Sequence, residues 1–166
     1  MVCLVQVTFS QQAEFPQSWT GNWSGELSWY KTGKTDPEKV KMQLRIQPDS
    51  AGRYTWQLVY GQDKKDNRPY FLLEKDRAKN HWVIDENNGI IIDQFWVGNK
   101  LSGAFTVQNT TIMNTYWLEN DTLYIEFYSI SAKPLSKTGA GTDESPTVDS
   151  YKINSYQRAV LTRKDD

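Results

Sequence analysis

The stretch Gly21-Asn22-Trp23-Ser24-Gly25 begins the strand around which the rest of the chain is organised. From residue 23 to residue 31 its apolar residues recur at every second position, so Trp23, Leu27 and Trp29 share one face. A period of two is typical of a strand with one face in a core and the other in water. The stretch therefore predicts a first strand, and the segments that follow are expected to close around it.

The clearest alternation lies in residues 40–46 and 53–60, where apolar and polar side chains exchange at each step. Between them stands Pro48-Asp49-Ser50-Ala51-Gly52. Proline fixes φ, aspartate bonds to its own backbone and glycine permits positive φ, so this segment predicts a turn. The two strands and the turn predict a hairpin.

The same pattern continues to the end of the chain. Further strands are predicted at residues 69–74, 81–84, 90–97, 101–107, 112–118, 123–128 and 151–162. The connections at 32–39 and 131–150 are longer, and the second is rich in Ser, Thr, Gly, Pro and Lys, which predicts a mobile loop. No long stretch has helical periodicity. We expect an all-β, antiparallel up-and-down barrel of about 8–10 strands, with a sandwich as the alternative, because closure removes exposed sheet edges.

Composition narrows the class of protein. The chain has 166 residues and a net charge of −1, which suits one domain at 13–166 and gives no electrostatic attraction to nucleic acid. One Cys and one His cannot form an internal disulfide or a Cys/His zinc site. No segment has about 18 continuous apolar residues, so we expect no membrane span.

Residues 1–12 resemble the back half of a secretory leader, with Ser10 before Gln11 as the cleavage point. On this interpretation the segment is a remnant of a leader that contains Cys3, and the protein is exported to the periplasm or the extracellular space. The alternative is an ordinary first strand or arm on the barrel.

Phe15-Pro16, followed by Trp19-Thr20-Gly21-Asn22-Trp23, resembles the start of calycin-group barrels, which include lipocalins, fatty-acid-binding proteins and nitrobindin-like proteins. Lipocalins carry Gly-x-Trp at this place, matched here by Gly21 and Trp23. The resemblance implies that Trp23 closes one end of the barrel and that an arginine from the last strand packs across it. Arg158 and Arg163 lie on opposite faces of that strand, and the sequence does not choose between them.

The chain also departs from these families. It lacks the C-terminal helix of typical lipocalins, and its first connection is too short for the helical hairpin of fatty-acid-binding proteins. Nitrobindin-like proteins ligate haem through a late histidine, whereas this chain has none after His81. We therefore expect no haem or other cofactor.

The aromatic content, with 7 Trp and 9 Tyr, favours a cavity for a small apolar molecule. The residues predicted to contact it lie on inward faces: Trp29, Met42, Leu44, Trp56, Phe105 and Phe127. The alternative is that these side chains fill the interior. Binding of a small hydrophobic ligand is the leading hypothesis.

Two other functions stay open. One is an enzyme on the same fold, an isomerase, hydratase or cyclase, which needs polar groups converging inside the barrel. Its candidates are His81, Asp93 and Glu126. Alternation places Asp93 and Glu126 outward, and no obvious set of partners accompanies His81, so no catalytic residue or metal ligand is predicted. The other is a packed barrel that acts as an interaction module.

Overall fold

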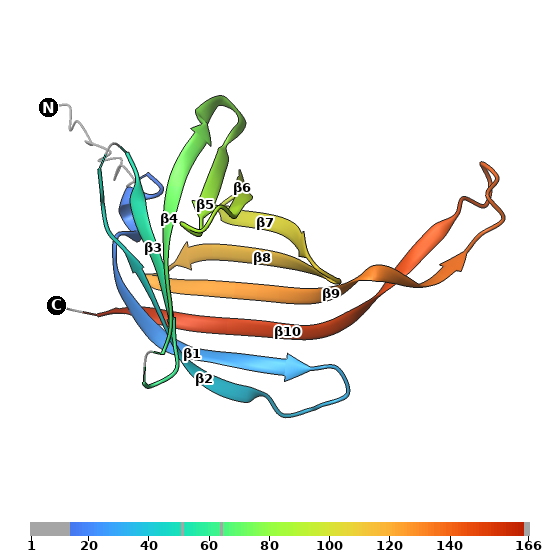
Figure 1. Ribbon diagram of the computed structural model, residues 1–166, viewed down its shortest axis with the longest axis horizontal. Coiled ribbons are helices and arrows are strands. Elements are labelled where there is room, and N and C mark those ends of the chain that lie inside the picture. The colour runs from blue at the N-terminus through green and yellow to red at the C-terminus, as the bar shows by residue number, and fades with distance from the viewer. Residues whose placement is uncertain (1–13, 51, 64, 165–166) are drawn as a thin grey trace, which may run out of the picture.

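The computed structural model describes residues 14–50, 52–63 and 65–164. It is a single closed barrel of ten antiparallel strands in which each strand pairs with its neighbours in sequence (Figure 1). The strands are β1 (Gly21–Lys31), β2 (Glu38–Ile46), β3 (Tyr54–Tyr60), β4 (Asp66–Asp76), β5 (His81–Asp85), β6 (Ile91–Val97), β7 (Lys100–Val107), β8 (Thr110–Glu119), β9 (Thr122–Thr138) and β10 (Val148–Lys164). The predicted up-and-down barrel is confirmed.

The first and last strands close the barrel. Their pairing runs without interruption from Asn22 opposite Lys164 to Lys31 opposite Ser155. On its other side β1 pairs with β2 from Gly21 to Trp29. Strand β1 is therefore hydrogen-bonded on both sides, to β10 and to β2, and the barrel wall has no open edge there.

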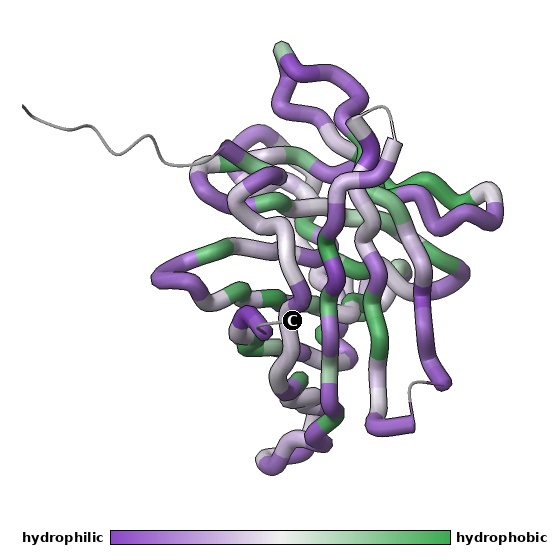
Figure 2. Tube along the Cα trace, turned by 90° about the vertical axis from the view of Figure 1, so that its left-hand side faces the viewer, coloured by the Kyte–Doolittle hydropathy of each residue, from purple (hydrophilic) through white to green (hydrophobic). Residues whose placement is uncertain are grey.

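Alternation decides which side chains fill the interior. On β2 the residues Met42, Leu44 and Ile46 are completely buried, while Gln43 and Arg45 between them are partly exposed. Figure 2 shows the same exchange of hydrophobic and hydrophilic segments along the strands, with hydrophilic residues at most turns. A period of two fixes the inward face because adjacent side chains point to opposite sides of the sheet.

Strand β4 is longer than the predicted 69–74. It begins at Asp66, which pairs with Tyr60, and includes Arg68, which pairs with Leu58. The sequence around these residues is polar enough to be read as loop. Its pairing with β3 nevertheless continues, so charged side chains enter the barrel wall.

Residues 131–150 differ most from the expectation of a mobile loop. Pairing with the barrel ends at Ser131 on β9 and at Ser155 on β10, but the two strands continue together to Thr138 and Val148. They form a two-stranded ribbon, called the arm, that projects from one end of the barrel (Figure 1). Serine and threonine are compatible with strands when each partner supplies the other's backbone hydrogen bonds.

Two short 3₁₀ turns, Gln17–Trp19 and Arg77–Lys79, are the helical elements of the described residues. No helix among those residues has the length and the apolar character needed to cross a membrane. The expected leader at 1–12, with Cys3, lies outside the described residues, so export remains a prediction.

Candidate functional site

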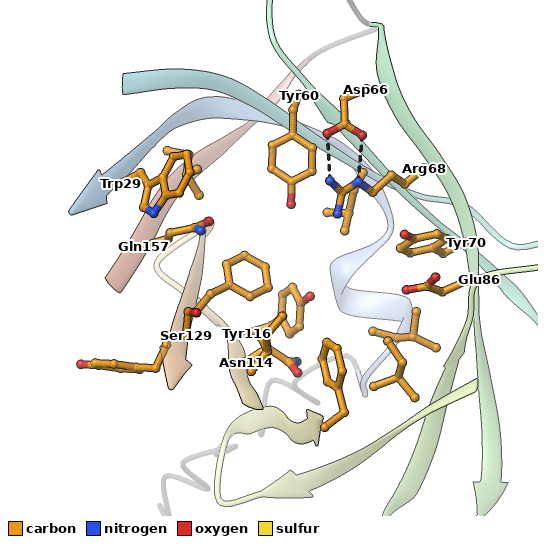
Figure 3. Close-up of a pocket in the computed structure, with 18 of the residues that line it drawn as sticks. Trp29, Tyr60, Asp66, Arg68, Tyr70, Glu86, Asn114, Tyr116, Ser129 and Gln157 are labelled. Atoms are coloured by element: carbon orange, nitrogen blue, oxygen red, sulfur yellow. Dashed lines mark hydrogen bonds and ion pairs between the residues drawn. The ribbon is translucent and has the colours of Figure 1, made fainter. Parts of the chain in front are cut away.

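One half of the barrel interior is hollow. Its cavity has a volume of about 390 Å³ and opens at the end where β1 finishes and β4 begins. Aliphatic side chains from six strands line it: Leu27, Val40, Leu58, Ile84, Ile92 and Ile112. Aromatic side chains complete the wall: Trp29, Tyr60, Tyr70, Phe105, Tyr116, Phe127 and Tyr128. Figure 3 shows Trp29, Tyr60, Tyr70 and Tyr116 around the cavity. Such a wall removes the hydration of an apolar guest.

The six residues predicted to contact a ligand divide into two groups. Trp29, Phe105 and Phe127 line the cavity, whereas Met42, Leu44 and Trp56 are completely buried in the packed half. All six point inward, as alternation requires. They differ in height along the barrel axis, because each strand crosses both the packed half and the hollow half.

The packed half ends in an aromatic cluster. The ring of Phe15 lies 4.9 Å from Trp19, 4.9 Å from Trp82 and 4.7 Å from Trp96, measured between ring centroids. Trp23 donates from Nε1 to the carbonyl oxygen of Trp19 at 2.8 Å. Phe15 and Trp19, from the 3₁₀ turn before β1 and the residues leading into it, pack on Trp82 of β5 and Trp96 of β6, and together these rings cover this end of the interior.

Of the two candidate arginines, Arg163 packs across Trp23. Its guanidinium lies 4.2 Å from the ring centroid and donates to the carbonyl oxygens of Ser18, at 3.1 Å, and Thr20. Arg158 points to the outer face, 5.6 Å from the ring of Tyr124. The two arginines lie on opposite faces of β10, and the face of Arg163 is the one that carries Trp23 on β1.

Gly21 makes the arginine contact sterically feasible. A Cβ at this position would collide with Nη1 of Arg163, and φ is +145°, a conformation that side chains with a Cβ rarely adopt. Gly21 therefore leaves space at the closed end of the barrel for the guanidinium.

An amide pair forms part of the cavity wall. Asn114 donates from Nδ2 to Oε1 of Gln94 at 2.7 Å, and Gln94 returns a hydrogen bond of 3.3 Å to Oδ1. Both side chains are buried. A Cβ at residue 103 would overlap the Gln94 amide, so the absent side chain of Gly103 is replaced by that amide rather than by empty space. Because the amides satisfy each other, they can remain inside an apolar wall.

Charged groups gather at the open end. Arg68 donates two parallel hydrogen bonds to Asp66, from Nε to Oδ1 at 2.8 Å and from Nη2 to Oδ2 at 2.9 Å (Figure 3). This guanidinium holds the pKa of Asp66 below its usual value, and it lies 5.0 Å from the ring of Tyr60. Burial of the Tyr60 phenol raises its pKa to about 12. Glu86 also faces the cavity, next to Tyr70.

These polar lining residues were missed from sequence. Tyr60 could have been found, because it continues the inward face of Trp56 and Leu58. Asp66, Arg68 and Glu86 gave no such signal, since they stand in polar segments that resemble loops.

Trp29 has a buried indole Nε1 without a hydrogen-bond partner among the described residues. Trp29 is part of the cavity wall, and the ammonium of Lys31 lies 4.2 Å from its ring centroid. A buried donor without an acceptor is unusual in folded proteins.

The three candidate catalytic residues, His81, Asp93 and Glu126, lie on strands of the barrel with their side chains on its outer face. His81 Nε2 is 2.7 Å from Oδ1 of Asp93, and Lys75 donates to the same oxygen at 3.0 Å. Lys75 first, and then His81, lower the pKa of Asp93. Glu126 accepts a 2.7 Å hydrogen bond from the hydroxyl of Tyr156 on the outer face. No three His, Cys, Asp or Glu side chains group as metal ligands in the part of the chain that the structure describes.

Comparison with known proteins supports the fold. No family model and no curated protein matches the chain. Its structure is similar to that of a protein with unknown function from the DUF3598 family of Nostoc punctiforme, with a TM-score of 0.62 and 15% identity over 87% of this chain and 47% of that chain. The chain thus spans about half the length of that protein. Rv2717c from M. tuberculosis aligns over 88% of this chain and 92% of its own, with a TM-score of 0.47 and 14% identity.

At these identities the similarity concerns the fold alone. The chain is a ten-stranded antiparallel barrel that fits a calycin-like fold, and the comparisons establish no family.

Proposed function

We propose that the barrel binds a small, largely apolar molecule in its hollow half. The observation that carries this proposal is the cavity of about 390 Å³, which is lined by aromatic and aliphatic side chains and opens at one end of the barrel. Cavities that hold small molecules measure roughly 300–1,000 Å³ and have mostly apolar walls with a few polar groups.

The contrast between the two halves of the interior supports binding. In the packed half, Trp23, Trp56 and Leu44 are 1%, 0% and 0% exposed, and aromatic rings cover the end. In the hollow half, Phe105 and Phe127 stay partly exposed although they point inward. Leaving such rings against water is unfavourable, and a guest that covers them gains about 25 cal/mol per Å² of apolar surface removed from water.

A cavity-filling substitution tests the proposal. We expect the neutral lipophilic dye Nile red to bind the wild-type protein with a blue-shifted emission and one site per chain. Ile112→Trp places a larger side chain in the cavity wall and is expected to weaken binding about tenfold or more, equivalent to about 1.4 kcal/mol. Ile91→Trp is the matched control, because Ile91 is 59% exposed on the outer face.

Circular dichroism and thermal unfolding of both variants establish that the barrel has folded. Absence of saturable dye binding to the wild type, or equal binding by the Ile112→Trp and Ile91→Trp proteins, would contradict an interior site. Native mass spectrometry of the purified protein gives an independent reading, since a retained ligand adds to the mass of the bare chain.

A further inference from the structure

The charges on the cavity wall do not balance. Asp66, Arg68 and Glu86 are the charged residues that line it. Arg68 is held by Asp66 through two hydrogen bonds, so the positive and negative charges of this pair cancel. Among the described residues, the carboxylate of Glu86 then remains as the charge of the lining without an ion-pair partner.

Glu86 follows β5 in the turn that leads to β6, and its side chain is partly buried. Its Oε2 accepts a 3.3 Å hydrogen bond from Nδ2 of Asn88. Within the described residues, no lysine or arginine forms an ion pair with Glu86. A partly buried carboxylate is stabilised by a positive partner, and among the described residues none forms an ion pair with Glu86.

The surroundings of Glu86 suit a cation. The ring of Tyr70 lies beside the carboxylate, and both side chains turn their oxygen atoms toward the cavity (Figure 3). Burial first, and then the charge of Glu86 and a hydrogen bond with it, raise the pKa of Tyr70 above its ordinary value, so its phenol stays neutral. Tyrosine rings also attract ammonium groups through their electron-rich faces.

An anionic guest meets the opposite conditions. A carboxylate in this cavity would be repelled by Glu86, and the positive charge of Arg68 is already offset by Asp66, which accepts two of its five N–H donors. The opening is therefore arranged against acids and in favour of bases.

We propose that the cavity selects molecules with a protonated amine at one end of an apolar body. The ammonium lies beside Glu86 and Tyr70, and the apolar body lies among Phe105 and Phe127. This inference rests on the proposed function, because it names the chemical class that the same cavity holds.

Three probes of equal chain length separate the charge from the apolar body: decylamine, decanol and decanoate. Isothermal titration calorimetry near neutral pH and at low salt is expected to show decylamine binding about tenfold or more tightly than decanol, with decanoate weakest. Glu86→Gln should bring decylamine down to the affinity of decanol and leave decanol unchanged. Glu119→Gln is the matched control, because it removes the same charge from the exposed last residue of β8, outside the cavity lining.

The outcomes are distinct. Equal binding of decylamine and decanol, or an amine preference that survives Glu86→Gln, overturns the inference and leaves the apolar site intact. If decanoate binds most tightly of the three, the inference is also overturned, and Arg68 becomes the candidate partner for a bound carboxylate. Failure of all three probes to bind contradicts the proposed function itself, and the selectivity for amines with it.

Discussion

The guanidinium of Arg163, near the end of the last strand, lies 4.2 Å from the ring centroid of Trp23, near the start of the first. The contact joins the two strands that close the barrel, because Trp23 and Arg163 are register partners. It also ties both strands to the preceding 3₁₀ turn, since the guanidinium donates to Ser18 and Thr20. The Arg163 side chain therefore stabilises both the pairing of β1 with β10 and the position of the 3₁₀ turn that covers the packed end.

Removing this side chain should destabilise the barrel. Arg163→Ala loses a cation–π contact and hydrogen bonds to two carbonyl oxygens, so we expect the free energy of unfolding to fall by about 2–3 kcal/mol. Arg158→Ala, on the outer face of the same strand, should change it by about 0.5 kcal/mol or less. Urea unfolding followed by tryptophan fluorescence measures both. Equal losses would show that the strand, rather than the closing contact, is responsible.

The amide pair in the cavity wall makes a different prediction. Gln94→Leu leaves the buried amide of Asn114 without its partner, and we expect a loss of about 1–3 kcal/mol in the free energy of unfolding. Replacing both residues by leucine should cost less than the sum of the single substitutions, because no polar group is then left unpaired. Additive losses in this double-mutant cycle would mean that the two amides do not depend on each other.

The arm should contribute little to barrel stability. Residues 133–153 are all exposed, and they include Leu135 and Tyr151, which are 72% and 48% exposed. Replacing residues 131–152 by an Asn-Gly turn joins β9 and β10 where barrel pairing ends. We expect the free energy of unfolding to change by about 1 kcal/mol or less. A loss of several kcal/mol, or failure to fold, would show that the arm supports the barrel.

Alkaline pH should lower the stability of the folded protein through the buried phenol of Tyr60. The pKa of Tyr60 is raised from 10.0 to about 12 by burial, so folding favours the neutral phenol. Its contribution to stability is complete below pH 10 and is lost as the pH rises through about 12. Tyr60→Phe should therefore lose less stability than the wild type across this window, as measured by thermal unfolding at stepped pH. Parallel curves for the two proteins would exclude Tyr60 as a source of the loss.

The strand plan could be predicted because one physical rule controls it. Alternation placed Met42, Leu44 and Ile46 on one face of β2, and the structure buries all three. The rule fails where both faces of a ribbon meet water. Residues 131–150 carry no apolar face for a core, so their composition resembled a loop although each strand of the arm pairs with the other.

The cavity could be predicted only in part. Alternation separates inward from outward residues, but it does not give height along the barrel axis, which depends on register between strands. Trp29 and Trp56 both point inward, yet one lines the cavity and the other is buried in the packed half. The charges of Arg68 and Glu86 were missed because side chains at the opening of a barrel are polar for the same reason as those in loops, namely contact with water.

The position of a bound guest is the most direct test of the central claim. Isoleucine methyl groups report on three places in the barrel: Ile112 on the cavity wall, Ile125 in the packed half and Ile91 on the outer face. In methyl NMR spectra recorded during a titration with decanol, we predict saturable shifts at Ile112, together with Ile84 and Ile92, and little change at Ile125 or Ile91. Shifts confined to Ile91, or none at any isoleucine up to the solubility of decanol, would contradict a ligand site inside the barrel.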